Sequence, residues 1–215
     1  MAPMEDVEDA WADLEEVLGP VEIVPVTYMN SIVGIKALCG RNNGIVCTSS
    51  NAKAALGWAL EQGERVLFLP DQHLGCNSAL NLGISLEEMV VWNPFRQLGG
   101  NTPEQLRQAK MVLWQGDCSV HTRFTSSQIN AARALHPDIN IIVHPECPME
   151  TVQAADMVGS TEFIREKVNS APPGSKWGIG TEVSLADRLA INNPDKTVFC
   201  LDPVTCPCST MYRVH

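Results

Sequence analysis

The chain has 215 residues and a formal net charge of −10, with 15 Lys and Arg residues against 25 Asp and Glu residues. Hydrophobic residues make up 45% of the chain and charged residues 19%, so it can bury a core and is not a disordered tail. No apolar run approaches the ~18 residues that a membrane span needs, which excludes a membrane protein. The acidic balance argues against a broad nucleic-acid-binding face.

The N-terminal segment and the cysteines bear on the cellular compartment. The first 19 residues are acidic and lack the basic and apolar regions of a secretory signal. Without an export signal, the eight cysteines are interpreted as reduced thiols, some of them metal ligands, rather than as a disulfide framework. We therefore expect a soluble cytoplasmic protein.

Short apolar runs alternate with helical patterns along the chain. The runs are rich in Val and Ile, which is typical of buried parallel strands. They cover Ile23–Thr27, Ile45–Cys47, Arg65–Leu69, Met89–Trp92, Met111–Trp114, Ile139–Val143, Asp156–Val158, Trp177–Ile179 and Thr197–Leu201. Helices with Ser, Thr or Asn as candidate N-caps are predicted at Asn51–Gln62, Pro103–Lys110, Ser126–Leu135, Thr161–Asn169 and Glu182–Asn192. The alternation predicts an α/β fold with parallel sheets.

One pattern of strand ends occurs twice. The first copy runs from VTYMN through CTSSNA to LPDQH, and the second runs from IIVHPEC through VGSTEF to GIGTE. The distance is 22 residues from Ser49 to Asp71 and again 22 residues from Ser160 to Glu182. The segment WQGDCSVHTRF interrupts the alternation between the copies. We expect two homologous domains, 1–117 with a leading helix and 118–215.

Polar residues follow the predicted strands in both copies. Ligands of open parallel sheets bind outside the carboxyl ends of the strands, where helix N-termini present N–H groups to anions. Ser49, Ser50, Ser160 and Thr161 are therefore candidate N-caps and also candidate donors to a phosphate or carboxylate. The segment LPDQHLG is interpreted as a loop brace rather than as the edge of a site.

The pair His144 and Glu146 has two interpretations. Alternation along a strand places residues i and i+2 on one side, so the pair is either a capped strand end with a satisfied histidine or a catalytic pair. Tyr28 and Asn30 at the same place in the first copy favour a site. There His144 would shuttle protons, and Glu146 would orient a cationic or imine nitrogen.

Three cysteines follow strands at the ends of the two copies. Cys118 is either a buried structural thiol or a metal ligand, whereas Cys206 and Cys208 in a Cys-Pro-Cys segment favour a metal role. A zinc finger is not expected because no second closely spaced Cys or His pair completes a tetrahedral set. Thiolates converging from separate domains suit an iron–sulfur cluster better.

The ordered motifs VTYMNS, VCTSSNA, FLPDQHLG, GDCSVHTRF, IIVHPECP, VGSTEF, GIGTE and CPCSTM resemble those of the quinolinate synthase family over essentially the whole chain. The resemblance implies homologous three-layer αβα domains with short parallel sheets around a pseudo-threefold axis, each giving one Cys to a [4Fe-4S] cluster. It implies condensation of iminoaspartate with dihydroxyacetone phosphate to quinolinate, the pyridine precursor of NAD. The iron left open would act as a Lewis acid.

The resemblance also implies roles for particular residues. Cys118 and Cys206 match the second and third cluster ligands, with Cys208 as a neighbour of the third. Tyr28, His144 and Glu146 match catalytic positions. Substrate contacts are implied for these three and for Asn30, Ser49, Ser160 and Thr161.

The match begins after the family's first cluster cysteine and stops before its last helix, so the first of three domains is not among these 215 residues. Two hypotheses follow. The chain is a quinolinate synthase fragment whose first domain a separate chain could supply, or it is a non-catalytic remnant or partner subunit that keeps the fold and part of the ligand site. A small zinc-binding α/β protein is a third hypothesis, which rests on the Cys-Pro-Cys segment alone.

Overall fold

The computed structural model describes residues 2–202. It forms two compact units that divide between Asp117 and Cys118. Each unit is a three-layer αβα arrangement around one parallel sheet, so the predicted α/β class is confirmed. Among the described residues, no helix has the length and apolar character needed to cross a membrane.

The first unit carries a five-stranded parallel sheet in the order β2-β1-β3-β5-β4. Its helices and strands are α1 Met4–Leu18, β1 Ile23–Tyr28, α2 Val33–Arg41, β2 Ile45–Cys47, α3 Ala52–Gln62, β3 Arg65–Leu69, α4 Gln72–Leu80, β4 Met89–Trp92, α5 Pro103–Gln108 and β5 Met111–Trp114.

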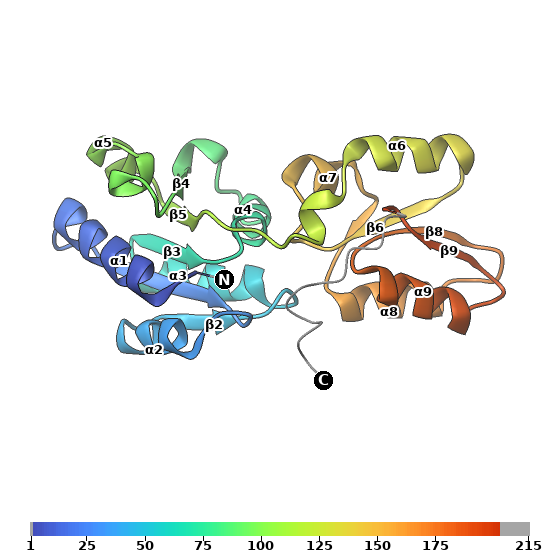
Figure 1. Cartoon of the computed structure of the whole chain (residues 1–215), viewed down its shortest axis with the longest axis horizontal. Helices are drawn as coiled ribbons and strands as arrows, with labels where there is room; N and C mark the ends of the chain where they lie inside the picture. The colour runs from blue at the N-terminus through green and yellow to red at the C-terminus, as the bar shows by residue number, and fades with distance from the viewer. Residues whose placement is uncertain (1, 203–215) are drawn as a thin grey trace. The chain divides into compact units, whose positions relative to one another are not determined.

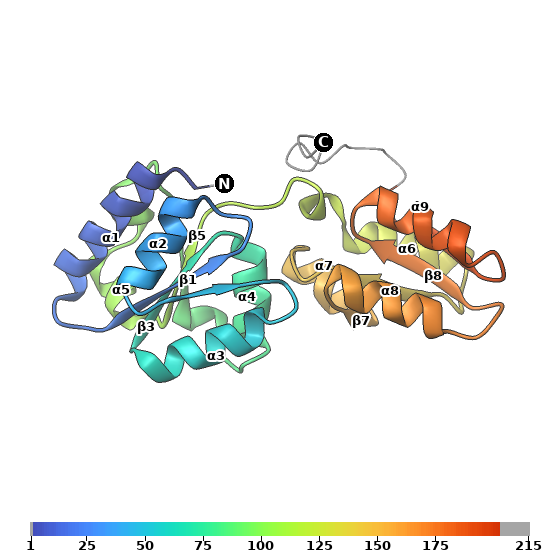
Figure 2. The ribbon, with the colours of Figure 1, turned by 90° about the horizontal axis from the view of Figure 1, so that it is seen from below.

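Alternation along the strands divides the first core between the two faces of the sheet. Leu67 and Leu69 pack with α1, α2 and α5, whereas Val66 and Phe68 pack with α3 and α4. Figure 2 shows α1 and α2 on one side of this sheet and α3 and α4 on the other. All four strand residues are fully buried, as expected of a parallel sheet with both faces covered.

The second unit carries a four-stranded parallel sheet in the order β7-β6-β8-β9. Its elements are the 3₁₀ turn η3 His121–Arg123, α6 Ser126–Leu135, β6 Asn140–Val143, α7 Met149–Ala154, β7 Met157–Val158, α8 Thr161–Ser170, β8 Lys176–Gly180, α9 Val183–Asn192 and β9 Thr197–Cys200. Helices α6 and α7 cover one face and α8 and α9 the other (Figure 1).

The two sheets share one strand order. Strands β2, β1, β3 and β5 of the first sheet follow the same sequence of neighbours as β7, β6, β8 and β9 of the second. In both, the chain crosses from one side of the first strand to the other, which creates a switch point between β1 and β3 and between β6 and β8. This common order supports the internal repeat. The equivalence of the units to successive domains of a larger enzyme stays a prediction.

Some local predictions differ from the structure. Helices α2, α4 and α7 lie in segments for which no helix was predicted, and α5 ends at Gln108 rather than at Lys110. Strand β6 ends at Val143, so His144 and Glu146 lie in a turn and not on one side of a continuing strand. The N-cap position of α3 is Asn51, which removes Ser49 and Ser50 as caps of that helix.

We predict that Leu67→Ala destabilises the first unit by about 2–5 kcal/mol, because Leu67 is fully buried in its central strand and the truncation leaves a cavity. Val33→Ala is the control: Val33 is 80% exposed, and its truncation is expected to change stability by less than about 0.5 kcal/mol. Urea unfolding of both variants measures the difference. Equal midpoints for the two would contradict this core assignment.

Candidate active site at the carboxyl edge of the second sheet

A tight turn follows β6 and sets the positions of His144 and Glu146. The backbone N–H of His144 continues the sheet by donating to the carbonyl of Gly180 at 3.0 Å, and the N–H of Cys147 donates back to the carbonyl of His144 at 3.0 Å. Pro145 occupies the second position of this turn, where its fixed φ is favourable. The turn therefore brings together two side chains that alternation had assigned to one strand face.

A second turn positions Cys118 and His121. The backbone N–H groups of His121 and Thr122 donate to the carbonyl of Cys118 at 2.9 and 3.1 Å. This places the two side chains three residues apart on one helical turn, where residues i and i+3 lie above each other.

The two turns meet in a buried polar cluster. His121 Nδ1 lies 2.7 Å from Glu146 Oε2, and His121 Nε2 lies 3.0 Å from the hydroxyl of Thr181, which directly follows β8. The His121 ring stacks on the His144 ring, with centroids 4.3 Å apart and planes 14° apart. All four residues are at most 8% exposed. The cluster lies at the carboxyl ends of β6 and β8, the switch point of this sheet.

The two stacked histidines differ in protonation. Burial alone would lower the pKa of His121, but its hydrogen bonds to Cys118 and Glu146 outweigh burial and raise the pKa to about 9. For His144, burial and the neighbouring His121 charge lower the pKa to about 3, although Glu146 opposes this. His144 Nδ1 also accepts a hydrogen bond from the backbone N–H of Glu146 at 3.3 Å. His144 is therefore neutral with its ring proton on Nε2, and His121 is the charged member.

The same cluster has the donors of a metal site. One ligand atom each of Cys118, His121 and Glu146 lies within 4.8 Å of the other two, and Cys118 is partly exposed whereas the other two are buried. If His121 lost its ring proton on binding, a thiolate, an imidazole and a carboxylate together would suit a transition metal rather than Mg²⁺ or Ca²⁺.

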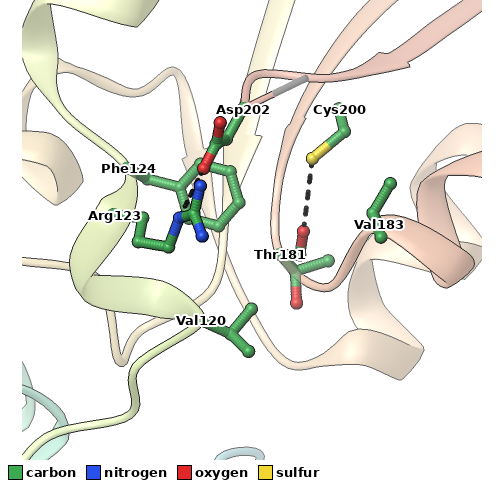
Figure 3. Close-up of a pocket in the computed structure, with 7 residues that line it drawn as sticks. All are labelled: Val120, Arg123, Phe124, Thr181, Val183, Cys200 and Asp202. Carbon is green, nitrogen blue, oxygen red and sulfur yellow. Dashed lines mark hydrogen bonds and ion pairs between the residues drawn. The ribbon is translucent and has the colours of Figure 1, made fainter. Parts of the chain in front are cut away.

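A small pocket of about 20 Å³ adjoins the cluster and shares Thr181 with it. In it, Arg123 Nε donates to Asp202 Oδ2 at 2.7 Å, and the Cys200 thiol faces the carbonyl of Thr181 at 3.5 Å (Figure 3). The volume lies below the ~300–1,000 Å³ usual for small-molecule sites. We therefore interpret this pocket as a small cavity next to the cluster and not as a separate ligand site. The ion pair ties the end of the described chain to the turn that carries His121.

The other predicted site residues of the second unit, Ser160 and Thr161, follow β7, which is the neighbour of β6 in the sheet. The backbone N–H of Gly159 donates to the carbonyl of Val143 at 3.1 Å, so β7 ends next to β6. Ser160 is the N-cap of α8 and accepts from the N–H of Phe163 at 3.3 Å, and Thr161 is the first helical residue. The predicted N-cap role of Ser160 is confirmed.

Tyr28, Asn30 and Ser49 belong to the first unit. Tyr28 ends β1 and pairs with Cys47 of β2, and Met29 donates to the carbonyl of Cys47 at 2.8 Å. Tyr28 and Ser49 are partly buried and Asn30 is exposed. These residues therefore follow two neighbouring strands at the carboxyl edge of the first sheet.

Two carboxylates occupy equivalent helix N-caps in the two units. Asp71 follows β3 and accepts from the N–H groups of His73 and Leu74 at 2.7 and 3.0 Å, and Glu182 follows β8 and accepts from the N–H of Leu185 at 3.3 Å. Asp71 thus caps α4, which agrees with the brace predicted for this segment. The equal spacing from Ser49 to Asp71 and from Ser160 to Glu182 ends in both units at a capping carboxylate.

Sequence reasoning gave no role to His121 and Thr181. The Cys-x-x-His spacing within GDCSVHTRF was the available signal for His121, because that spacing fits one helical turn. Thr181 has no such signal and is found only through the pairing of β6 with β8. Cys206 and Cys208 lie outside the described residues.

The fold and the cluster together define an α/β protein with buried titratable residues at a strand switch point. The sequence matches the profile of the family described as quinolinate synthetase A protein over residues 1–215. The chain belongs to this family, which confirms the resemblance.

Curated relatives agree with the family match. The chain is 56% identical over 215 residues to quinolinate synthase of Corynebacterium glutamicum and 50% identical over 215 residues to that of Rhodopirellula baltica. It is 49% identical over 217 residues to the enzyme of Herpetosiphon aurantiacus. Each match covers 100% of this chain but only 55% to 58% of the relative. The chain thus spans little more than half the length of these proteins.

The capping role of Ser160 can be tested through the stability of α8. Ser160→Ala is expected to destabilise the second unit by about 1 kcal/mol, because α8 loses its side-chain cap, whereas Ser160→Asp keeps a cap acceptor. Thermal unfolding of the two variants measures this. An Ala variant as stable as the unmodified chain would exclude the capping role.

Proposed function

We propose that this chain carries two αβα domains of a quinolinate synthase and most of its acid–base machinery. The reaction would condense iminoaspartate with dihydroxyacetone phosphate to quinolinate, with release of phosphate and water, in NAD biosynthesis. The observation that carries the proposal is the buried cluster of Glu146, His144 and His121 beside Cys118. It pairs a proton-transfer site with a thiolate ligand in a member of this family.

The proposed cofactor is a [4Fe-4S] cluster with Cys118 and Cys206 as two of its ligands. Cys118 is partly exposed whereas its neighbours His121 and Glu146 are buried. Its thiol would therefore be accessible to an iron–sulfur cluster. Cys206 is the fourth residue after Asp202, which is tied to Arg123, so the chain between them can span at most about 14 Å. When bound, the cluster would supply a Lewis acid for a substrate oxygen.

The chain's own residues would perform the proton transfers. His144 is neutral and carries its proton on Nε2, so it would donate a hydrogen bond to a substrate oxygen and orient it. Glu146 is held by His121 at one oxygen and would orient or deprotonate the imine nitrogen of iminoaspartate. Tyr28 would assist the proton transfers as a hydroxyl donor and acceptor.

The remaining predicted residues would bind the anionic groups of the two substrates. Ser160 and Thr161 present hydroxyl groups at the N-terminus of α8, where the helix dipole favours a phosphate or carboxylate. Asn30 and Ser49 offer an amide and a hydroxyl at the edge of the first sheet. Because the net charge of the chain is −10, such local donors would have to hold both anions.

A third domain, with the first cluster cysteine, would complete this site. In the proposal it comes from a longer form of the protein or from a separate chain. A cytoplasmic location accompanies the proposal, because a reducing compartment keeps cysteine thiols available as ligands. The alternative is a non-catalytic remnant or partner subunit that keeps the fold and part of the ligand site.

Turnover distinguishes the two hypotheses. The chain is reconstituted anaerobically with iron and sulfide and assayed for quinolinate with iminoaspartate and dihydroxyacetone phosphate, alone and with a separately expressed first domain. The enzyme hypothesis predicts quinolinate in at least one of these mixtures and its loss in Glu146→Gln. Stabilisation by ligand without turnover in either mixture would favour the non-catalytic hypothesis.

Cys118→Ser is expected to abolish cluster loading, because a hydroxyl is a poor iron ligand in place of a thiolate. Iron and sulfide content and the visible charge-transfer absorbance measure loading. Cys76→Ser is the matched control, since Cys76 is also partly buried but lies in the first unit on α4. Equal iron content in the two variants would remove Cys118 from the ligand set.

Cys206 and Cys208 are two residues apart, so substituting each in turn shows which one is the ligand. Cys206→Ser is expected to lose the cluster and Cys208→Ser to keep it, because Cys206 matches the third ligand. The same iron and sulfide analysis applies. The reverse result would move the ligand to Cys208, and zinc in place of iron in both variants would favour a zinc site.

A further inference from the structure

His121 makes three specific contacts, and the proposed function gives it no role that explains them. Both ring nitrogens have polar partners, Glu146 at 2.7 Å and the Thr181 hydroxyl at 3.0 Å. One ring face lies on His144. The ring therefore contacts Glu146 and His144, both of which the proposed function uses, and it is itself buried at 8% exposure.

These contacts fix both the direction of the two ring nitrogens and the plane of the ring. The hydrogen bonds to Glu146 and Thr181 come from opposite edges of the imidazole, and the stacking on His144 fixes the plane. Thr181 itself is 1% exposed and follows β8 directly, so its hydroxyl is held by the sheet. A series of hydrogen bonds therefore connects Thr181, at the end of β8, through His121 to the Glu146 carboxylate.

We propose that His121 is a positioning residue that holds the Glu146 carboxylate in its working orientation. The Nδ1–H group of His121 donates to Oε2 of Glu146 and fixes the plane of the carboxylate, while Thr181 anchors the opposite edge of the ring. His121 does not contact substrate. It acts on the reaction through Glu146, and it depends on the proposed function only for the identity of that reaction.

The geometry favours this role over a purely structural one. A histidine that served only to satisfy a buried polar group would need one partner, yet both of these bonds and the ring stacking end on site residues or on the residue that follows β8. An unrestrained glutamate side chain has several rotamers of similar energy, and a misplaced catalytic group loses rate steeply. Fixing the carboxylate before substrate arrives is what such a brace supplies.

Two substitutions divide the functions of the ring. In His121→Asn the amide N–H₂ can take the place of Nδ1 and still donate to Glu146, whereas in His121→Gln the amide lies near the position of Nε2 and serves Thr181 instead. Thr181→Val removes the anchor without touching Glu146. We expect His121→Gln to lower kcat about a hundredfold with little change in KM, and His121→Asn to restore most of it. Equal loss in both variants would overturn the proposal.

A second readout is independent of turnover. In the ¹⁵N-histidine NMR spectrum of the 215-residue chain, the Nδ1–H signal of His121 is expected to be protected from exchange and to shift in Glu146→Gln. Thr181→Val should weaken its protection while the rest of the spectrum is unchanged. A His121 Nδ1–H signal that is indifferent to Glu146→Gln would overturn the proposal. If the wild-type protein makes no quinolinate, the proposed function fails, but this spectrum still decides the role of His121.

Discussion

The hydrogen bond between His121 and Glu146 is the interaction on which the rest of the site depends. A buried carboxylate is costly unless it is paired and hydrogen-bonded, and here a histidine at 2.7 Å provides both. Together with a hydrogen bond to Cys118, this bond raises the pKa of His121 against the effect of burial, and burial with the charge on His121 lowers the pKa of His144. Burial and the neighbouring Cys118 act together with this contact, so that His121 is the charged histidine and His144 the neutral one.

The two units show how one topology can hold different chemistry. Both have the same order of four strands and a capping carboxylate after the equivalent strand. At the switch point of the first sheet, buried Thr27 donates to the carbonyl of Leu69 at 2.9 Å and bonds to Ser31. At the switch point of the second sheet, the titratable cluster occupies this place. The neutral hydroxyl of Thr27 joins the ends of β1 and β3, whereas the second sheet has titratable groups at the corresponding place.

The strands could be predicted from the sequence because each is a short apolar run with both faces buried. The strand β3 Arg65–Leu69 and the strand β5 Met111–Trp114 have the predicted bounds for this reason. The helices α2, α4 and α7 were missed because glycines, polar residues or short length weaken the helical pattern in VGIKALCGR, QHLGCNSAL and METVQA. Their helical state depends on packing against the sheet, which no local pattern contains.

The candidate site was predictable in part. His144 and Glu146 were found from their place after a buried strand, although a turn and not strand alternation brings them together. His121 and Thr181 could not be assigned, because their roles arise from the pairing of β6 with β8 and from a turn 20 residues or more away in the sequence. The family resemblance supplied residue roles, but only the contacts explain how the carboxylate is held.

The central claim is that Cys118 and the buried cluster form one metal-dependent acid–base site. The most direct measurement is a crystal structure of the anaerobically reconstituted chain, mixed with quinolinate, with anomalous data at the iron edge. The account predicts iron bonded to Cys118 Sγ and quinolinate within hydrogen-bond reach of His144 and Glu146. Iron bonded elsewhere, or quinolinate bound away from these two residues, would contradict it.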